Sequence, residues 1–445
     1  MSMDWFTIPE LSWMIIGERM NEGALLYVDI WDDIGPLSAW SYRIIDFVFG
    51  RSQLAIQIIG LIIFLFQIFF INYISLRHKM YNENNYLPAL FYGLLGLVFF
   101  NIVTLSPHLL GLTFVLISFN HLFNHVETRN KTDGNLLNIG LYIGIASLFY
   151  LPFFLMMFVH VIGLVFFTNT IGRRYLLLTY GVMIPFIITW LIYAWHGGGI
   201  NFSGIFLHSI LDFESTKFLA LKSILILGST TILLFVIASL KILSGFGYTV
   251  FQVRIQKIMF LAAMVMLIIY TVYSDHDGYG LIIFFPWIAF FASHFFIKIK
   301  NSLKRELSFS IYFFTIIAIY IGVTFQLFGF KNFIEFDSLM VKNYAENVAY
   351  TGKKILVLGQ DINPYVISKQ ATPYFNWRLS QDQLTNLDYY DNLESINKNF
   401  RKDMPEFIID QIGLAPEIFH QIPLLGAEYK SVKNGIYQRV AEPSN

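Results

Sequence analysis

Ten apolar segments follow one another along this chain of 445 residues, and they decide what it can fold into. They are Ser52–Ile74, Leu87–Leu105, Leu109–Phe123, Leu136–Leu151, Phe153–Thr168, Tyr175–Trp195, Leu221–Leu243, Ile258–Tyr273, Leu281–Ile297 and Phe309–Phe328. About 20 consecutive apolar residues suffice for a helix to cross the hydrocarbon core of a bilayer. The composition agrees, since 56% of the residues are hydrophobic and 13% are charged. The sequence therefore predicts an all-α membrane bundle of about ten transmembrane helices.

Basic residues are concentrated in every second connection between these segments. The first, third, fifth, seventh and ninth connections carry Lys and Arg, for example Arg173 and Arg174. The charged residues of the sixth and eighth connections are mainly Asp and Glu. Lys and Arg in short loops stay on the cytoplasmic side of a membrane. The odd connections are therefore predicted to face the cytoplasm. We expect a multi-pass protein of a bacterial inner membrane whose N-terminal segment and C-terminal domain are periplasmic.

The number of segments depends on the apolar stretch Asn135–Thr170. As one helix rising about 1.5 Å per residue, this stretch would greatly exceed a hydrocarbon core of about 30 Å. Pro152 lies at its centre, where a proline breaks or turns a helix. We therefore predict a tight helical hairpin here.

The region before the first segment, residues 1–51, is expected outside the membrane. It is acidic, and Leu11–Met20 within it is an amphipathic stretch suited to lying at the membrane surface. It lacks the basic start, apolar stretch and cleavage site of a signal peptide. We expect a further membrane span to precede it in the natural protein and to carry it outward.

The region after the bundle of residues 52–330 has the polarity of a globular domain. In residues 331–445, Lys354–Gly359 and Glu406–Asp410 are short apolar runs typical of buried strands. Gln381–Phe400 has helical spacing, and Asn434-Gly435 divides Tyr429–Val440 as a hairpin turn would. A small α/β domain on the outer face is predicted.

The densest group of reactive side chains lies just before the first apolar segment. Asp29, Asp32 and Asp33 fall within five residues, beside Tyr27 and Trp31. Aromatic faces stack on sugar rings, and carboxylates accept hydrogen bonds from hydroxyl groups or act as a general base. The group is thus suited to binding a sugar on a lipid carrier. The alternative is a solvated loop with interfacial aromatic residues, which is common near membrane ends.

The stretch Glu10–Trp40 resembles the first external loop of the GT-C superfamily, multi-pass glycosyltransferases that use polyprenyl-phosphate sugars. The resemblance rests on Leu26-Tyr27-Val28-Asp29-Ile30-Trp31-Asp32, on Gly35-Pro36-Leu37, and on a multi-span body followed by an outer α/β domain. It implies a GT-C-like fold and transfer of a sugar from a polyprenyl-phosphate carrier to an envelope acceptor. The body from Arg51 to about Gly198 also resembles uncharacterised bacterial membrane proteins.

The chain departs from the GT-C pattern in two places. Pro9-Glu10 stands where the superfamily usually carries an acidic pair, so the carboxylate usually taken as the catalytic base is missing. The membrane span that normally precedes the loop is missing as well. Asp29 or Glu10 is then expected to deprotonate the acceptor in an inverting transfer.

The leaving phosphate of such a reaction requires cationic donors near the outer membrane surface. Arg19, Arg43 and Arg51 are the candidates, because a guanidinium group binds phosphate oxygens in pairs. For Arg43 and Arg51 the alternative is anchoring at the start of the first span. Tyr27, Trp31 and Asp32 are expected to contact the substrate.

Two outer connections add weaker signals. Asp275 and Asp277 flank His276 on a short turn and supply oxygen ligands that suit a divalent cation, although a solvated turn is the alternative. His208 and Asp212, four positions apart, are expected to share a helical face and to line the same cleft. The chain has no Cys, which rules out thiolate metal sites and disulfides, and its zero net charge argues against a nucleic-acid partner.

Two other functions stay open. A non-catalytic, GT-C-like scaffold subunit of an envelope assembly would account for the missing carboxylate and for the scarcity of ionisable residues within the bundle. A membrane iron oxygenase would need His121 and His125, spaced to face one metal, with His160 or His108 completing the site. The predicted depths of these histidines in the membrane differ, which argues against the iron enzyme.

Overall fold

The computed structural model describes residues 6–98, 102–127, 133–168, 171–212, 218–243, 247–274, 276–325, 338–342 and 349–440. The chain forms two compact units. The sheet unit comprises Met1–Gln53, Tyr193–His208 and Met340–Asn445, and the helical unit comprises Leu54–Ile192 and Ser209–Leu339. The division at residues 51 and 330 stays a prediction, while the contacts group the first and last regions of the chain in one unit.

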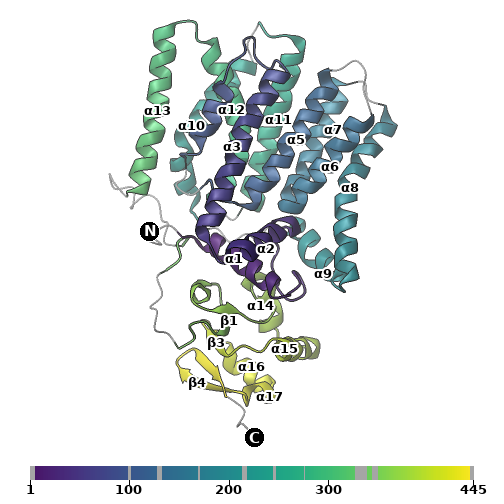
Figure 1. Ribbon diagram of the computed structural model, residues 1–445, viewed down its shortest axis with the longest axis vertical. Helices are drawn as coiled ribbons and strands as arrows, with labels where there is room; N and C mark the ends of the chain where they lie inside the picture. The colour runs from purple at the N-terminus through teal and green to yellow at the C-terminus, as the bar shows by residue number, and fades with distance from the viewer. Residues whose placement is uncertain are drawn as a thin grey trace. The chain divides into compact units, whose positions relative to one another are not determined.

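The helical unit consists of long helices that run roughly parallel to one another (Figure 1). Its elements are α3 (Gln53–Arg77), α4 (Leu87–Leu95), α5 (Pro107–Glu127), α6 (Asp133–Phe149), η1 (Leu151–Leu155), α7 (Met156–Phe167), α8 (Gly172–Trp195), η3 (His208–Leu211), α10 (Leu221–Leu243), α11 (Val250–Tyr273), η4 (Tyr279–Phe284), α12 (Phe285–Lys298) and α13 (Ser302–Thr324). The first residue of α3, the last residues of α8 and the first residue of η3 belong to the sheet unit.

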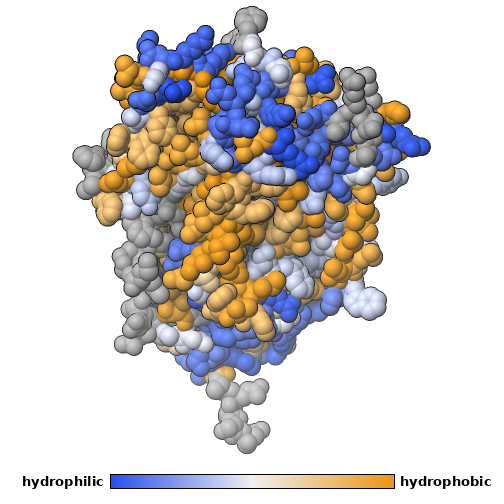
Figure 2. All heavy atoms as spheres, turned by 45° about the horizontal axis from the view of Figure 1, so that its top comes forward, coloured by the Kyte–Doolittle hydropathy of each residue, from blue (hydrophilic) through white to orange (hydrophobic). Residues whose placement is uncertain are grey.

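Seven of the described helices are long and apolar enough to cross a membrane. Each of the ten predicted segments contains a helix, but α4 has 9 residues, α6 has 17 and α7 has 12. The predicted count of about ten spans is therefore not confirmed. Many large apolar side chains of this unit are exposed, among them Ile62, Phe69 and Phe166, and Figure 2 shows a broad hydrophobic area on the surface. Such a surface suits contact with lipid tails.

The break predicted at Pro152 is confirmed. Helix α6 ends at Phe149, a short 3₁₀ helix spans Leu151–Leu155, and α7 begins at Met156. Pro152 occupies the first turn of the 3₁₀ helix, where its missing N–H removes no hydrogen bond.

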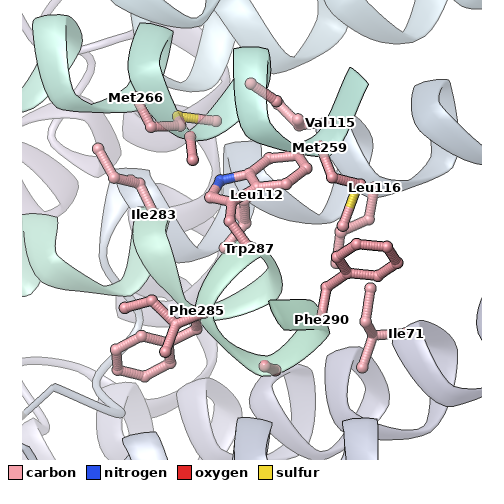
Figure 3. Close-up of a cluster of buried hydrophobic side chains, with 14 of the residues drawn as sticks. Ile71, Leu112, Val115, Leu116, Met259, Met266, Ile283, Phe285, Trp287 and Phe290 are labelled. Carbon is pink, nitrogen blue, oxygen red and sulfur yellow. The ribbon is translucent and has the colours of Figure 1, made fainter. Parts of the chain in front are cut away.

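The centre of the helical unit is a cluster of buried apolar side chains (Figure 3). It draws on α3, α5, α11, η4 and α12, through Ile71, Leu112, Val115, Leu116, Met259, Met266, Ile283, Phe285, Trp287 and Phe290. The Trp287 ring lies 4.9 Å from that of Phe119. Because lipid tails are as apolar as these side chains, close packing rather than exclusion of water must hold such helices together.

Glycines allow α6 and α8 to approach each other at backbone distance. A Cβ atom on Gly140 would lie 2.1 Å from the Leu178 carbonyl oxygen, and one on Gly181 would lie 2.3 Å from the Leu137 carbonyl oxygen. Gly144, one turn after Gly140, meets the Val182 carbonyl oxygen in the same way. Small residues spaced four apart are a common device for packing membrane helices.

We expect Gly140→Leu to separate α6 from α8 and to destabilise the helical unit by about 1–3 kcal/mol, because the new side chain meets backbone that cannot yield. Thermal unfolding in detergent measures the effect. Gly163→Ala in α7 is the matched control, since its nearest neighbours would be side-chain atoms 3.5 Å away. Equal melting temperatures for the two variants would contradict the prediction.

The sheet unit contains a five-stranded sheet in the order β2-β1-β3-β5-β4. The strands are β1 (Lys354–Leu358), β2 (Lys369–Gln370), β3 (Phe407–Asp410), β4 (Tyr429–Lys433) and β5 (Ile436–Arg439). β1 pairs in parallel with β2 and β3, with Ile355 opposite Phe407, whereas β5 pairs antiparallel with β3 and β4. The two predicted strands and the Asn434-Gly435 hairpin are confirmed.

Helices complete the sheet unit. They are α1 (Ile8–Asn21), α2 (Pro36–Phe49), α9 (Gly199–Asn201), the π-helix η2 (Phe202–Leu207), the 3₁₀ helix η6 (Asn363–Val366), α14 (Trp377–Thr385), α15 (Tyr390–Lys402), α16 (Ala415–Gln421) and α17 (Pro423–Gly426). The helical spacing of Gln381–Phe400 corresponds to two helices rather than one. The break falls at Asn386 and Asp388, whose side chains compete with helical backbone hydrogen bonds.

The stretch Leu11–Met20, predicted to be amphipathic, lies within α1. Ten of the 14 residues of α1 are buried, Glu10 and Arg19 among them. Helix α1 packs against α2, where the rings of Trp13 and Tyr42 stack with centroids 5.5 Å apart. Protein therefore covers the polar side of α1.

Candidate functional site

The loop between α1 and α2 turns around Tyr27, which adopts a left-handed backbone conformation (φ 70°) that few residues other than glycine take up. Its N–H donates to the Ile30 carbonyl oxygen (2.8 Å) and its hydroxyl donates to the Ile34 carbonyl oxygen (2.7 Å). The ring is fully buried against Tyr193 and Phe202, at centroid distances of 5.2 and 5.8 Å. Tyr27, predicted to contact substrate, is thus the anchor of the loop.

Trp31 fastens the next part of the loop to the chain before α14. The backbone N–H of Trp31 donates to the Pro373 carbonyl oxygen (2.8 Å), and the backbone carbonyl oxygen of Trp31 accepts from the Asn376 N–H (3.1 Å). The indole ring meets the Tyr374 ring edge-on at 5.2 Å and is partly exposed. Of the two aromatic residues predicted to bind a sugar, Trp31 is the one with accessible surface.

Asp32 is a buried carboxyl group with a strongly perturbed acidity. Burial, followed by the charge of neighbouring Asp33, raises its pKa to about 7. Its Oδ1 accepts a hydrogen bond from the Ile34 N–H (2.9 Å), while Asp33 forms an ion pair with Arg378. A carboxyl group whose pKa is near neutrality can hold or release a proton under physiological conditions, which marks it as a candidate functional group.

Asp29 and Glu10, the two predicted bases, differ in accessibility. Asp29 keeps about a fifth of its side chain exposed, accepts from the Leu25 N–H (2.9 Å) and forms an ion pair with Lys402. Glu10 is fully buried. It forms a capping box with Thr7 at the start of α1 and accepts from Gln53 Nε2 (3.1 Å). In this structure Glu10 stabilises the first turn of α1, and Asp29 is the carboxylate within reach of solvent.

A network of ion pairs brings together two of the three predicted phosphate-binding arginines. We call it the ion-pair network, and its members are Glu18, Arg19, Glu22, Arg51, Lys354, Lys369 and Asp403. With four basic and three acidic side chains, the ion-pair network carries one net positive charge.

Arg19 lies at the centre of the ion-pair network. Its Nη2 is 2.6 Å from Asp403 Oδ2 and its Nη1 is 3.3 Å from Glu22 Oε2. Burial alone would raise the pKa of Asp403, but the hydrogen bond from Lys354 and the charge of Arg19 hold that pKa below its usual value. Asp403 is therefore the anionic partner that keeps Arg19 in place.

Arg51 joins the ion-pair network from the chain just before α3. Its Nε is 2.5 Å from Glu18 Oε2, and its Nη1 donates to the Tyr365 carbonyl oxygen (2.8 Å). Lys369 connects the two arginines, since its Nζ lies 2.7 Å from Glu22 Oε1 and 3.9 Å from Glu18 Oε1.

Two guanidinium donors of the ion-pair network are buried and unpaired. Within the part of the chain that the structure describes, Arg19 Nε and Arg51 Nη2 have no hydrogen-bond partner. A buried donor without an acceptor costs free energy, more so when it is charged. An incoming anion would supply the missing acceptors.

The chain itself connects this ion-pair network with the carboxylate loop. Lys402 pairs with Asp29, and the next residue, Asp403, pairs with Arg19. Consecutive Cα atoms are about 3.8 Å apart, so the end of α15 places the base candidate close to the arginine.

Arg43 is not part of the ion-pair network. It lies on α2, where its guanidinium group sits over the Trp40 ring at 5.1 Å from the centroid. His208 is exposed and begins the 3₁₀ helix η3, in which residues three apart, not four, share a face. His208 and Asp212 belong to different units, so the predicted common cleft stays a prediction.

The predicted metal ligands are placed only in part. Asp275 lies outside the described residues, and Asp277 is buried, with its Oδ1 accepting from the Gly280 N–H (3.2 Å). Burial raises the pKa of Asp277 to about 6. Across the described ranges, no group of three His, Asp or Glu residues is placed to hold a metal ion.

Three of the four histidines proposed for an iron site form hydrogen bonds or ring contacts inside the helical unit. The His160 ring lies 2.8 Å from the Met156 carbonyl oxygen and 3.1 Å from Ser118 Oγ. His121 Nδ1 is 3.4 Å from Asn135 Oδ1, and the His108 ring packs on that of Tyr150 at 4.2 Å. The observed contacts give the iron alternative no support.

Sequence reasoning missed the C-terminal half of the site. Lys354, Lys369, Lys402 and Asp403 come from the sheet and α15, more than 300 positions after Arg19. Lys354 and Lys369 each begin a strand, and this is the only local signal they carry. Their convergence on Arg19 depends on the parallel pairing of β1 with β2.

The long apolar helices, together with a small sheet unit that contains the first loop, form a fold that a solved membrane protein shares. The chain is similar to the crystal structure of ArnT from Cupriavidus metallidurans bound to undecaprenyl phosphate, with a TM-score of 0.50 and 11% identity. The similarity covers 69% of this chain and 60% of ArnT, which is less than two thirds of that protein. The apo state of ArnT matches with a TM-score of 0.48 and 12% identity.

No protein-family model and no curated protein sequence matches the chain. At this identity the likeness to ArnT establishes the fold alone.

Proposed function

We propose that the chain is a GT-C-type glycosyltransferase that moves a sugar from a polyprenyl-phosphate carrier to an envelope acceptor at the outer face of the inner membrane. The observation that carries the proposal is the ion-pair network, in which buried arginine donors have no acceptor among the described residues and lie beside a loop of three carboxylates. The ArnT-like fold supports it, since the similar ArnT structure is bound to undecaprenyl phosphate.

The proposed reaction is an inverting substitution. The acceptor hydroxyl oxygen attacks the anomeric carbon, the bond from that carbon to the phosphate oxygen breaks, and the hydroxyl proton passes to a carboxylate. Asp29 is the proposed base because it is the accessible one of the two predicted bases, and the acceptor hydroxyl would replace Lys402 as its partner. Arg19 and Arg51 would stabilise the charge that develops on the leaving phosphate.

Asp32 and Trp31 complete the proposed site. A buried carboxyl group with a pKa of about 7 can donate a hydrogen bond to a sugar hydroxyl when protonated. The partly exposed Trp31 ring offers a face for the sugar.

We expect Asp29→Asn to lower sugar transfer by about 100-fold or more, because general-base catalysis contributes at least that factor. Native mass spectrometry of the full chain purified in detergent provides the measurement. The variant is expected to retain the carrier with its sugar, and the unaltered protein to retain the bare carrier.

Asp388→Asn is the matched control, since Asp388 is an exposed aspartate of the same unit. It should behave as the unaltered protein. Equal transfer by Asp29→Asn and Asp388→Asn would remove Asp29 from the mechanism.

A specific observation favours a second function, a non-catalytic scaffold with a GT-C-like fold. Glu10 is buried in a capping box, and Asp29 and Asp33 are both held in ion pairs. Absence of any carrier lipid, with a protein co-purifying instead, would favour the scaffold over the enzyme.

A further inference from the structure

Helix α2 of the sheet unit exposes its apolar side. The exposed residues Trp40, Ile44, Phe47 and Val48 follow the spacing i, i+4, i+7 and i+8, which places them on one helical face. Phe47 is 81% exposed and Ile44 and Val48 are each 61% exposed. Four large apolar residues on one face of two turns form a surface that water does not favour.

The opposite side of α2 is occupied by protein. Ser38, Ala39, Tyr42 and Ile45 are buried there, and Tyr42 stacks on Trp13 of α1. Asp46 accepts a hydrogen bond from Asn21 Nδ2 (2.8 Å). Helix α2 is therefore apolar on both sides, one packed against its own unit and the other exposed, whereas a surface helix usually turns a polar side outward.

The chain after α2 indicates what covers this face. Helix α2 ends at Phe49 and the membrane-spanning candidate α3 begins at Gln53. Four residues reach at most about 14 Å, so the end of α2 must lie near the bilayer surface wherever the sheet unit sits. Leu54 and Ile58, near the start of that span, are exposed apolar residues as well.

The charge beside the face is complementary to phospholipid headgroups. Arg43 lies over the Trp40 ring, so an aromatic and a cationic group share one edge of the face. Trp residues concentrate at membrane interfaces, and arginine side chains extend to the phosphate level from an apolar surface.

We infer that α2 is an interfacial helix whose face of Trp40, Ile44, Phe47 and Val48 lies among bilayer phospholipids at the outer surface. This role goes beyond sugar transfer and does not depend on it. Helix α2 then fixes the depth of the carboxylate loop that precedes it at the level of lipid phosphates.

Single cysteines test the inference, because the chain has none of its own. Phe47→Cys carries an environment-sensitive fluorophore, and the full chain is reconstituted in vesicles of phosphatidylethanolamine and phosphatidylglycerol. Leu424→Cys is the matched control, since Leu424 is a 72% exposed apolar residue of the same unit. Lipids with a nitroxide near the glycerol end of the acyl chain are expected to quench the label at position 47 several-fold more strongly than the label at position 424.

Quenching of equal strength at the two positions would overturn the inference. So would equally fast reaction of both cysteines with a water-soluble reagent, which would leave the face free for a protein partner. Disulfide formation between two Phe47→Cys chains without lipid quenching would show a second copy as the occupant. If Phe47→Cys does not fold, Val48→Cys on the same face replaces it.

Discussion

Replacing Arg19 by alanine is expected to destabilise the sheet unit by about 1–3 kcal/mol, because the change removes one of the two cationic partners of the Asp403 carboxylate and leaves it with Lys354 alone. Hydrogen exchange of the amides in α1 and β1 measures the loss in the full chain. The same change removes the guanidinium group that we propose to bind the carrier phosphate, so carrier retention should fall as well.

Arg401→Ala separates this effect from the loss of any surface ion pair. Arg401 pairs with Glu428 at 2.9 Å, but half of its side chain is exposed. Such pairs contribute about 0–1 kcal/mol. A comparable loss of protection from hydrogen exchange in the two variants would show that the Arg19–Asp403 pair stabilises the unit no more than an exposed ion pair does.

Asp32→Asn is expected to stabilise the protein above neutral pH. The pKa of Asp32 is raised to about 7 in the folded state, so the folded state holds a proton that the unfolded chain releases near pH 4. The contribution of Asp32 to stability is therefore greatest below about pH 4, falls as the pH rises to about 7, and is level above that. The total loss is about 4 kcal/mol, and asparagine, which cannot ionise, avoids it.

Thermal unfolding in detergent at about pH 5 and about pH 8 checks this expectation. The fall in melting temperature between the two conditions should be smaller in Asp32→Asn than in the unaltered protein. Asp388→Asn, at an exposed position, should leave the fall unchanged. An identical pH dependence in all three proteins would contradict the proposed cost of burying Asp32.

Local signals in the sequence were reliable guides to secondary structure. The break at Pro152, the strands at Lys354–Leu358 and Phe407–Asp410, and the Asn434-Gly435 hairpin all depend on neighbours in the chain. The number of spans was harder to predict, because hydropathy does not show how many apolar residues a helix will include. Helix α4 uses 9 residues of a segment predicted to extend from Leu87 to Leu105.

The roles of individual side chains depended on partners that spacing cannot reveal. Tyr27 was predicted to be a sugar-binding aromatic residue, yet it is buried by Tyr193, at the end of the predicted sixth span, and by Phe202, just after it. Glu10 has the carboxylate side chain that a general base requires, but it forms a capping box at the start of α1. The phosphate-binding role of Arg19 and Arg51 stays a prediction, and the acidic and basic residues that pair around them are known only from the fold.

The ion pair between Arg19 and Asp403 joins residues 384 positions apart. During synthesis Arg19 therefore has no Asp403 to pair with until α15 has been made and has reached the same side of the membrane. Contacts of such separation form late and slowly. Any chain that stops before residue 403 would insert its helices and yet leave Arg19 of α1 without Asp403. Shortened products are therefore expected to be degraded rather than to persist as inactive protein.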